Sequence, residues 1–334
     1  MVSSGQMGFM DRNLSDVVIN TAVINEGANM RRVACIGECM LELSGIGHDN
    51  MQLSYGGDTL NTATYLARLG ASVDYVTALG DDPYSDWMSE QWQAEGIGTE
   101  LVIRAKGRLP GFYTIRTDDG GERQFFYWRD QAPARDFFEL PGSSVVVEKL
   151  STYDWIYLTG VTLSLYTAKV LARLFDMLEK VRANGGKIAF DSNYRPRGWP
   201  NAETARTVFD EVLARTDLAA PTLDDDRQVY GDMSAEECAD RLHNCGVGEV
   251  VVKLDADGCL VSAPGLREIV PTTPKAQPVD TTGAGDAFNA GYLAARLAGA
   301  KINDAAFQAH RLAGEVIMHR GAIMPRHAMT EEKP

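Results

Sequence analysis

Asp280-Thr-Thr-Gly-Ala-Gly-Asp-Ala-Phe288 is the stretch of sequence that decides the fold, and a helical pattern follows it to Leu297. Its glycines let backbone N–H groups approach a ligand closely, and a helix start offers further N–H groups with a favourable dipole. The stretch is therefore predicted to cradle an anion. A carboxylate at Asp286 would repel a phosphate there, unless it accepts the proton of a hydroxyl group that attacks the phosphate. The alternative is that Asp286 only caps the helix.

Strand-like and helix-like segments alternate on the N-terminal side of this stretch. The expected strands cover residues 33–37, 73–79, 154–158, 187–190, 218–220 and 249–254. The expected helices cover residues 58–69, 84–95, 163–184, 202–214, 234–245, 283–297 and 302–319. Such alternation predicts an α/β fold with a mostly parallel sheet that is covered on both faces.

One segment departs from this rhythm. Residues 112–116 and 124–129 alternate like paired strands around the turn at 118–122, which predicts a β-hairpin appended to the α/β framework. Its aromatic residues can either pack as ordinary strand residues or form the wall of a binding site.

The composition excludes several classes of protein. The 334 residues carry a formal charge of −14, which argues against a nucleic-acid partner, because such binding needs clustered Lys and Arg. The five cysteines have neither disulfide-like nor zinc-like spacing, so we expect reduced thiols and a cytoplasmic location. No apolar run is long enough to span a membrane. Residues 1–31 and 327–334 are expected to be tails, the first of them disordered.

The stretch that ends at Asp286 resembles the signature of the PfkB, or ribokinase-like, carbohydrate kinases. Gly56-Gly-Asp-Thr-Leu-Asn-Thr-Ala63 resembles the family's second signature. The resemblance covers about residues 32–325, and it implies a three-layer α/β/α sandwich at 32–326 with inserted β-lid segments at about 44–55 and 106–130. It also implies that Asp286 is the catalytic base and that the backbone of Gly283, Ala284 and Gly285 forms an anion hole.

Three central segments extend the resemblance to the nucleotide side. Asp191-Ser-Asn-Tyr-Arg195 matches the family's Asp-x-Asn-x-Arg, and Thr222-Leu-Asp-Asp225 stands where the family has Asn-x-x-Glu. The segment 251–258 resembles the nucleotide-side strand and turn, with Asp255 where glycine is usual. The resemblance implies ATP and Mg²⁺ as cofactors, with Asp225 as an indirect metal contact. The residues implied to contact ATP are Asn193, Thr222, Lys253, Gly258, Thr282, Gly283 and Gly285.

Within the family the chain looks most like the 2-keto-3-deoxygluconate kinases, through residues 37–43, 56–61, 125–129 and 193–197. This implies ATP-dependent phosphorylation of that sugar acid at its terminal (C6) hydroxyl. The residues implied to contact the sugar acid are Gly57, Asn61, Tyr113, Tyr127, Arg129, Arg195 and Asp286. Arginine suits this role because its planar fork grips a carboxylate through two N–H bonds. Surface ion pairing is the ordinary alternative for both arginines.

Other functions stay open on the sequence alone. A fructokinase-like or ribokinase-like enzyme is one alternative, and a catalytically silent sugar-binding regulator on the same fold is another. The preferred epimer of the sugar acid and the dependence on a monovalent cation are also open. A dinucleotide oxidoreductase is excluded because Gly37 is followed by Glu-Cys-Met, and no P-loop motif is present. The resemblance further implies that copies of the chain pair through the lid.

Overall fold

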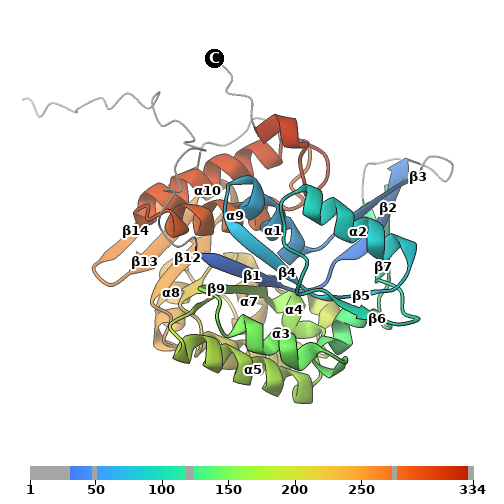
Figure 1. The fold of residues 1–334 in the computed structure, drawn as a ribbon. Helices are drawn as coiled ribbons and strands as arrows, with labels where there is room; N and C mark the ends of the chain where they lie inside the picture. Colours follow the sequence, from blue (N-terminus) through green and yellow to red (C-terminus); the bar gives the residue numbers. More distant parts are fainter. Residues whose placement is uncertain (1–30, 47–50, 118–122, 273–276, 330–334) are drawn as a thin grey trace, which may run out of the picture.

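The computed structural model describes residues 31–46, 51–117, 123–272 and 277–329. An eight-stranded sheet lies between two layers of helices (Figure 1). In spatial order its strands are β14 (Leu266–Val270), β13 (Cys259–Ala263), β12 (Glu249–Lys253), β11 (Leu218–Ala219), β10 (Lys187–Asp191), β9 (Trp155–Thr159), β1 (Arg32–Ile36) and β4 (Ser72–Val76). The strands from β12 to β4 are parallel, whereas β13 pairs antiparallel with both β12 and β14. The prediction of a mostly parallel sheet is therefore confirmed.

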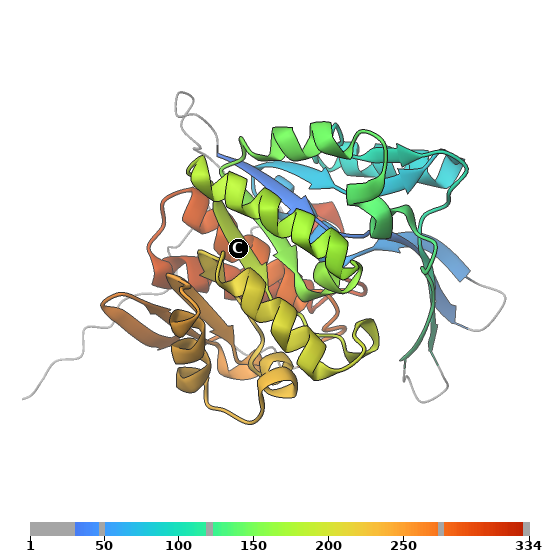
Figure 2. The ribbon, with the colours of Figure 1, turned by 90° about the horizontal axis from the view of Figure 1, so that it is seen from below.

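Helices cover both faces of the sheet, as the alternation predicted. One layer contains α1 (Asp58–Arg68), α2 (Pro83–Ala94), α9 (Ala284–Leu297) and α10 (Ile302–Val316). The other contains α3 (Ser143–Leu150), α4 (Gly160–Ser164), α5 (Ala168–Ala183), α6 (Ala202–Leu213), α7 (Leu223–Tyr230) and α8 (Ala235–Asn244). Figure 2, seen from below, brings the second layer to the front. Each layer encloses its own apolar core against the sheet.

Two segments that were each expected to form one element form two elements in the structure. The helix expected at 163–184 is divided, because Thr167 caps a new helix by accepting a hydrogen bond from the Val170 N–H. The strand expected at 73–79 is also divided. Its second part, β5 (Ala78–Gly80), leaves the central sheet and pairs with β6 (Ile103–Ala105). The hairpin of β13 and β14 was not expected, because β13 is buried along most of its length and lacks polar alternation.

A smaller sheet projects from the side of the sandwich (Figures 1 and 2). In spatial order it contains β3 (Met51–Gly56), β2 (Met40–Ile46), β7 (Phe112–Thr117) and β8 (Arg123–Trp128), and we call it the lid sheet. The strands β7 and β8 pair antiparallel, so the predicted hairpin is confirmed. The turn expected at 118–122 and residues 1–30 of the first expected tail lie outside the described residues. Residues 327–329 of the second expected tail belong to a short 3₁₀ helix, Arg326–Met329.

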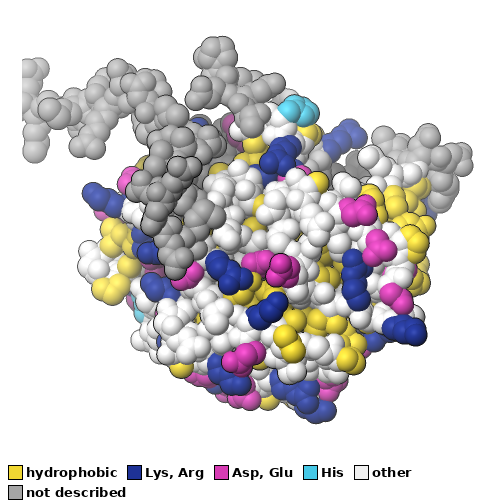
Figure 3. Space-filling model, in the orientation of Figure 1, with side chains coloured by type: hydrophobic (Ala, Val, Ile, Leu, Met, Phe, Trp, Pro, Cys, Tyr) yellow, Lys and Arg dark blue, Asp and Glu magenta, His cyan; other side chains and the backbone are white. Residues whose placement is uncertain are grey.

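The surface carries both signs of charge. Figure 3 shows acidic and basic side chains interspersed over the face seen in Figure 1. Hydrophobic side chains gather at the right-hand edge of this view, where the lid sheet projects. On the lid sheet, β8 exposes Phe126, Tyr127 and Trp128. Within the described ranges, none of the helices is long and apolar enough to cross a membrane.

Candidate active site

The glycine loop predicted to hold an anion forms the start of α9. Gly283 precedes the helix in the left-handed conformation, with φ of 76°. A Cβ atom there would lie 2.7 Å from the Cβ of Ala322, so both the conformation and the space require glycine. Asp280 stabilises the loop, because its carboxylate accepts hydrogen bonds from the Thr282 N–H (3.1 Å), the Thr282 hydroxyl (2.8 Å) and the Gly321 N–H (2.7 Å). The predicted nucleotide residue Thr282 therefore helps to shape this loop.

Asp286 lies in the first turn of α9. The helix α1 packs beside α9 (Figure 1). Asp286 Oδ2 accepts a hydrogen bond of 2.8 Å from Asn61 Nδ2. The Asn61 N–H in turn donates to the carbonyl oxygen of Gly57, at the N-terminus of α1, over 2.8 Å. The tertiary structure thus brings together three predicted site residues from the two signature segments.

The environment of Asp286 raises its pKa to about 7. Burial is the main cause, followed by the negative charge of Asp58, while the hydrogen bond from Asn61 acts in the opposite direction. Asp58 itself accepts hydrogen bonds from Asn193 Nδ2 (2.7 Å) and the Thr159 hydroxyl (2.5 Å). A carboxyl group with a pKa near neutrality is suited to accept a proton during catalysis.

Asp58 was not predicted as a site residue. The sequence feature that could have identified Asp58 is its position directly after the Gly56-Gly57 pair, at the start of a helix.

Lys253 lies inside the molecule, behind the start of α9. Its ammonium group contacts Asp191 Oδ2 at 2.6 Å and Asn289 Oδ1 at 3.2 Å. A Cβ atom placed on Gly285 would lie 3.6 Å from this ammonium group. Lys253, which was predicted to contact the nucleotide, therefore puts a positive charge beneath the glycine loop. Two buried partners, Asp191 and Asn289, hold it there.

The other predicted nucleotide residues lie at turns after the central strands. Asn193 follows β10 with a φ of 31°, which is uncommon for a residue with a side chain and is typical of functional turns. Thr222 precedes α7 and forms a parallel β-bridge with Lys253. Gly258 has a φ of 101°, and a Cβ atom there would collide with the backbone at Val270. Asp255, which replaces the usual glycine, has a positive φ of 50° that Asp tolerates better than most residues.

Arg195, two residues after Asn193, forms an ion pair with Asp225. Arg195 Nη1 lies 3.2 Å and 3.1 Å from the two carboxylate oxygens of Asp225, which is in the first turn of α7. The structure thus joins a residue predicted for the sugar acid to one predicted for Mg²⁺. Burial raises the pKa of Asp225, while Arg195 opposes the effect.

No group of three or more His, Cys, Asp or Glu side chains within the described ranges is arranged to hold a metal ion. Mg²⁺ is commonly bound through one or two carboxylates together with phosphates and waters, so Asp225 fits a supporting role.

The lid sheet contributes the remaining predicted sugar residues. Tyr113 on β7 lies opposite Tyr127 on β8, and their stacked rings are 5.7 Å apart. The Tyr113 hydroxyl donates a hydrogen bond to Glu42 on β2. Arg129 follows β8 and forms an ion pair with Glu38, which was not among the predicted site residues. Each predicted sugar-binding arginine therefore already has a carboxylate partner within the chain.

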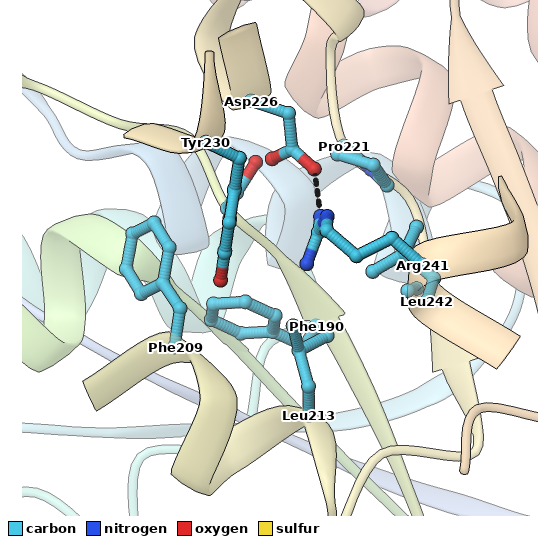
Figure 4. Close-up of a pocket in the computed structure, with 10 residues that line it drawn as sticks. Phe190, Phe209, Leu213, Pro221, Asp226, Tyr230, Arg241 and Leu242 are labelled. Carbon is cyan, nitrogen blue, oxygen red and sulfur yellow. Dashed lines mark hydrogen bonds and ion pairs between the residues drawn. The ribbon is translucent and has the colours of Figure 1, made fainter. Parts of the chain in front are cut away.

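A small cavity lies beneath α7 (Figure 4). Asp226 and Arg241 form an ion pair at its rim, and the Tyr230 ring lies 3.6 Å from the Arg241 guanidinium. The cavity measures about 10 Å³, whereas sites for small molecules usually measure about 300–1,000 Å³. It is therefore too small for a sugar or a nucleotide. The ion pair anchors α7 from below and so supports the position of the neighbouring Asp225.

Comparisons with known proteins agree with the fold. The model of the pfkB family carbohydrate kinases matches residues 30–329. The chain is 46% identical over 306 residues to the 2-dehydro-3-deoxygluconokinase of Escherichia coli K12, covering 90% of this chain and 99% of the relative.

Two solved structures share the fold. The 2-dehydro-3-deoxygluconokinase of Thermotoga maritima has a TM-score of 0.77 at 22% identity, covering 88% of this chain and 94% of that one. The fructokinase of Xylella fastidiosa with bound ATP has a TM-score of 0.76 at 21% identity, covering 90% and 95%.

Proposed function

This chain belongs to the pfkB family of carbohydrate kinases, and on that premise we propose that it phosphorylates 2-keto-3-deoxy-D-gluconate at its terminal (C6) hydroxyl, with ATP as the donor. The observation that carries the chemistry is Asp286, a buried carboxyl group with a pKa of about 7 beside the glycine loop. The name of the E. coli relative supports the substrate.

In the proposed reaction Asp286 accepts the proton of the attacking hydroxyl group. A bond forms between that oxygen and the γ-phosphorus, the bond to the β-phosphate oxygen breaks, and ADP leaves with the electron pair. Backbone N–H groups at Gly283–Gly285 bind the oxygens of the transferring group. Lys253 adds a positive charge beneath the loop. Mg²⁺, when bound, offsets the charge of the phosphates, with Asp225 as an indirect contact.

The lid sheet and Arg195 are proposed to select the sugar acid. Arg129 and Arg195 supply positive charge for its carboxylate, and the paired rings of Tyr113 and Tyr127 supply an apolar wall with hydroxyl groups. Gly57 and Asn61 are proposed to contact the sugar near the reacting hydroxyl, since Asn61 binds Asp286 directly. The nucleotide is proposed to lie along Asn193, Thr222, Gly258 and Thr282. The exposed aromatic residues of β8 support the proposal that copies of the chain pair through the lid sheet.

A side-by-side rate assay tests this function. We expect kcat/KM for 2-keto-3-deoxygluconate to exceed that for fructose or ribose by about 100-fold or more, because hydrogen bonds between charged groups contribute about 1.5–3 kcal/mol each. The galactonate-type keto-sugar in the same assay identifies the preferred epimer. A preference for fructose or ribose would contradict the acidic substrate, and sugar binding without turnover would indicate a silent regulator.

The pH dependence tests the role of Asp286. The base must be deprotonated to accept a proton, so kcat/KM is expected to fall as the pH drops below the pKa of about 7. Asp58→Asn removes a negative charge that raises this pKa, so the acidic limb of the profile should move to lower pH. Glu179→Gln, which removes an exposed carboxylate from α5, serves as the control and should leave the limb in place. If the acidic limb of the pH profile did not move in Asp58→Asn, the assignment of Asp286 as the base would be contradicted.

A further inference from the structure

Glu38 and Arg129 form an ion pair at the junction between the lid sheet and the central sheet. Glu38 lies in the connection from β1 to β2, and Arg129 directly follows β8. The two residues therefore lie in two different segments of the chain that connect the core to the lid sheet. The side chain of Glu38 is 2% exposed and that of Arg129 is 22% exposed, so the pair is largely shielded from water.

Two glycines allow this pair to lie close to the candidate site. A Cβ atom on Gly57 would collide with the carbonyl oxygen of Glu38, so the backbone of Glu38 touches the residue that directly precedes α1. A Cβ atom on Gly111 would lie 2.9 Å from Glu38 Oε1 and 3.3 Å from the Cβ of Arg129. The pair is therefore packed between the start of α1 and the entry to β7.

The charges around Glu38 show why the pair is held together. Burial raises the pKa of Glu38, and the guanidinium groups of Arg129 and Arg135 oppose this effect, while Asp58 adds to it. A buried carboxylate and a buried guanidinium are each costly alone, and removing one partner leaves the other uncompensated. Arg129 is therefore tied to one orientation by a group that has little freedom to move.

We propose that Glu38 is a positioning residue for recognition of the sugar acid, because it holds the Arg129 guanidinium in the orientation that receives the substrate carboxylate. The inference rests on the proposed function. A guanidinium has five N–H donors in a planar fork, and Glu38 engages it through Nη2, so one carboxylate partner does not saturate it. Holding a long side chain in place before binding reduces the conformational entropy lost when the ligand arrives.

Glu38→Gln tests this role because it keeps the size of the side chain and removes its charge. We expect KM for 2-keto-3-deoxygluconate to rise about 10-fold or more, from the loss of a charge-assisted contact that orients Arg129. The values of KM for ATP and of kcat/KM for fructose should stay within about twofold, since neither substrate uses the carboxylate site. In an Arg129→Ala background, Glu38→Gln should add less than about twofold, because the effect passes through Arg129.

Two further variants separate positioning from general stability. Glu249→Gln breaks another acid–arginine pair, with Arg296, away from the lid sheet, and should leave all KM values unchanged. Glu38→Asp keeps the charge and should give a KM between those of the wild type and Glu38→Gln. It also provides the test if the Gln variant does not fold.

The outcomes distinguish this inference from the proposed function. A wild-type preference for fructose or ribose overturns the proposed substrate, whatever the variants do. A wild-type preference for the sugar acid, with KM for it unchanged or lowered in Glu38→Gln, overturns only the role of Glu38. A parallel rise in KM for ATP, or an undiminished effect in the Arg129→Ala background, also overturns it.

Discussion

Asp286→Asn is expected to lower kcat about 100-fold to 10,000-fold, the range usually contributed by a positioned general base. The amide keeps the shape of the side chain and cannot accept the proton of the attacking hydroxyl. KM for ATP should change little, because this carboxyl group is bonded to Asn61 on α1, whereas the proposed phosphate contacts are backbone N–H groups. Steady-state kinetics with varied ATP and varied sugar acid measure both quantities.

The same variant decides between catalysis and helix capping. An acidic residue in the first turn of a helix stabilises it by about 0.3–1 kcal/mol through the helix dipole. Asp304 has this position in α10, so Asp304→Asn is a matched control that should lose a little stability and keep kcat. If Asp286→Asn behaved like Asp304→Asn, with near-normal turnover, the assignment of Asp286 as the base would be wrong.

Gly283→Ala is expected to lower kcat/KM about 100-fold to 1,000-fold, similar to the loss of one donor from an oxyanion hole. The added Cβ would lie 2.7 Å from the Cβ and 2.8 Å from the carbonyl oxygen of Ala322. Either the glycine loop or the segment at Ala322 must move, and the N–H groups at the start of α9 would then lose their alignment with the transferring phosphoryl group.

Gly299→Ala is the control for backbone strain. Gly299 follows the same helix with a φ of 86°, and a Cβ atom there would have no atom within 4 Å among the described residues. Both variants should lose about 1–2 kcal/mol of unfolding free energy from the left-handed conformation. Only Gly283→Ala should lose activity as well. Equal activity in the two variants, measured beside their Tm values, would show that the loop does not hold the phosphoryl group.

Part of the candidate site was predictable because its geometry is local. The glycine loop and Asp286 are contiguous in sequence, and the backbone conformation of such a turn follows from which residues lack a Cβ atom. The hairpin of β7 and β8 was predictable for the same reason, since alternation around a short turn sets its pairing.

The division of the helix expected at 163–184 was missed, because its apolar spacing continues across the break and the capping bond from Thr167 involves one hydroxyl group.

The sequence by itself determined the α/β class and the glycine loop that leads to Asp286, because these depend on apolar periodicity and on residues adjacent in the chain. Only the tertiary structure decided which polar and charged side chains meet. Asn61 reaches Asp286 across 225 residues of sequence, and Asn193 reaches Asp58 across 135. The ion pairs of Glu38 with Arg129 and of Lys253 with Asp191 also join residues far apart in the sequence. The pKa of Asp286 and the orientation of Arg129 depend on burial and on charges within a few ångströms, and chain folding alone sets those distances.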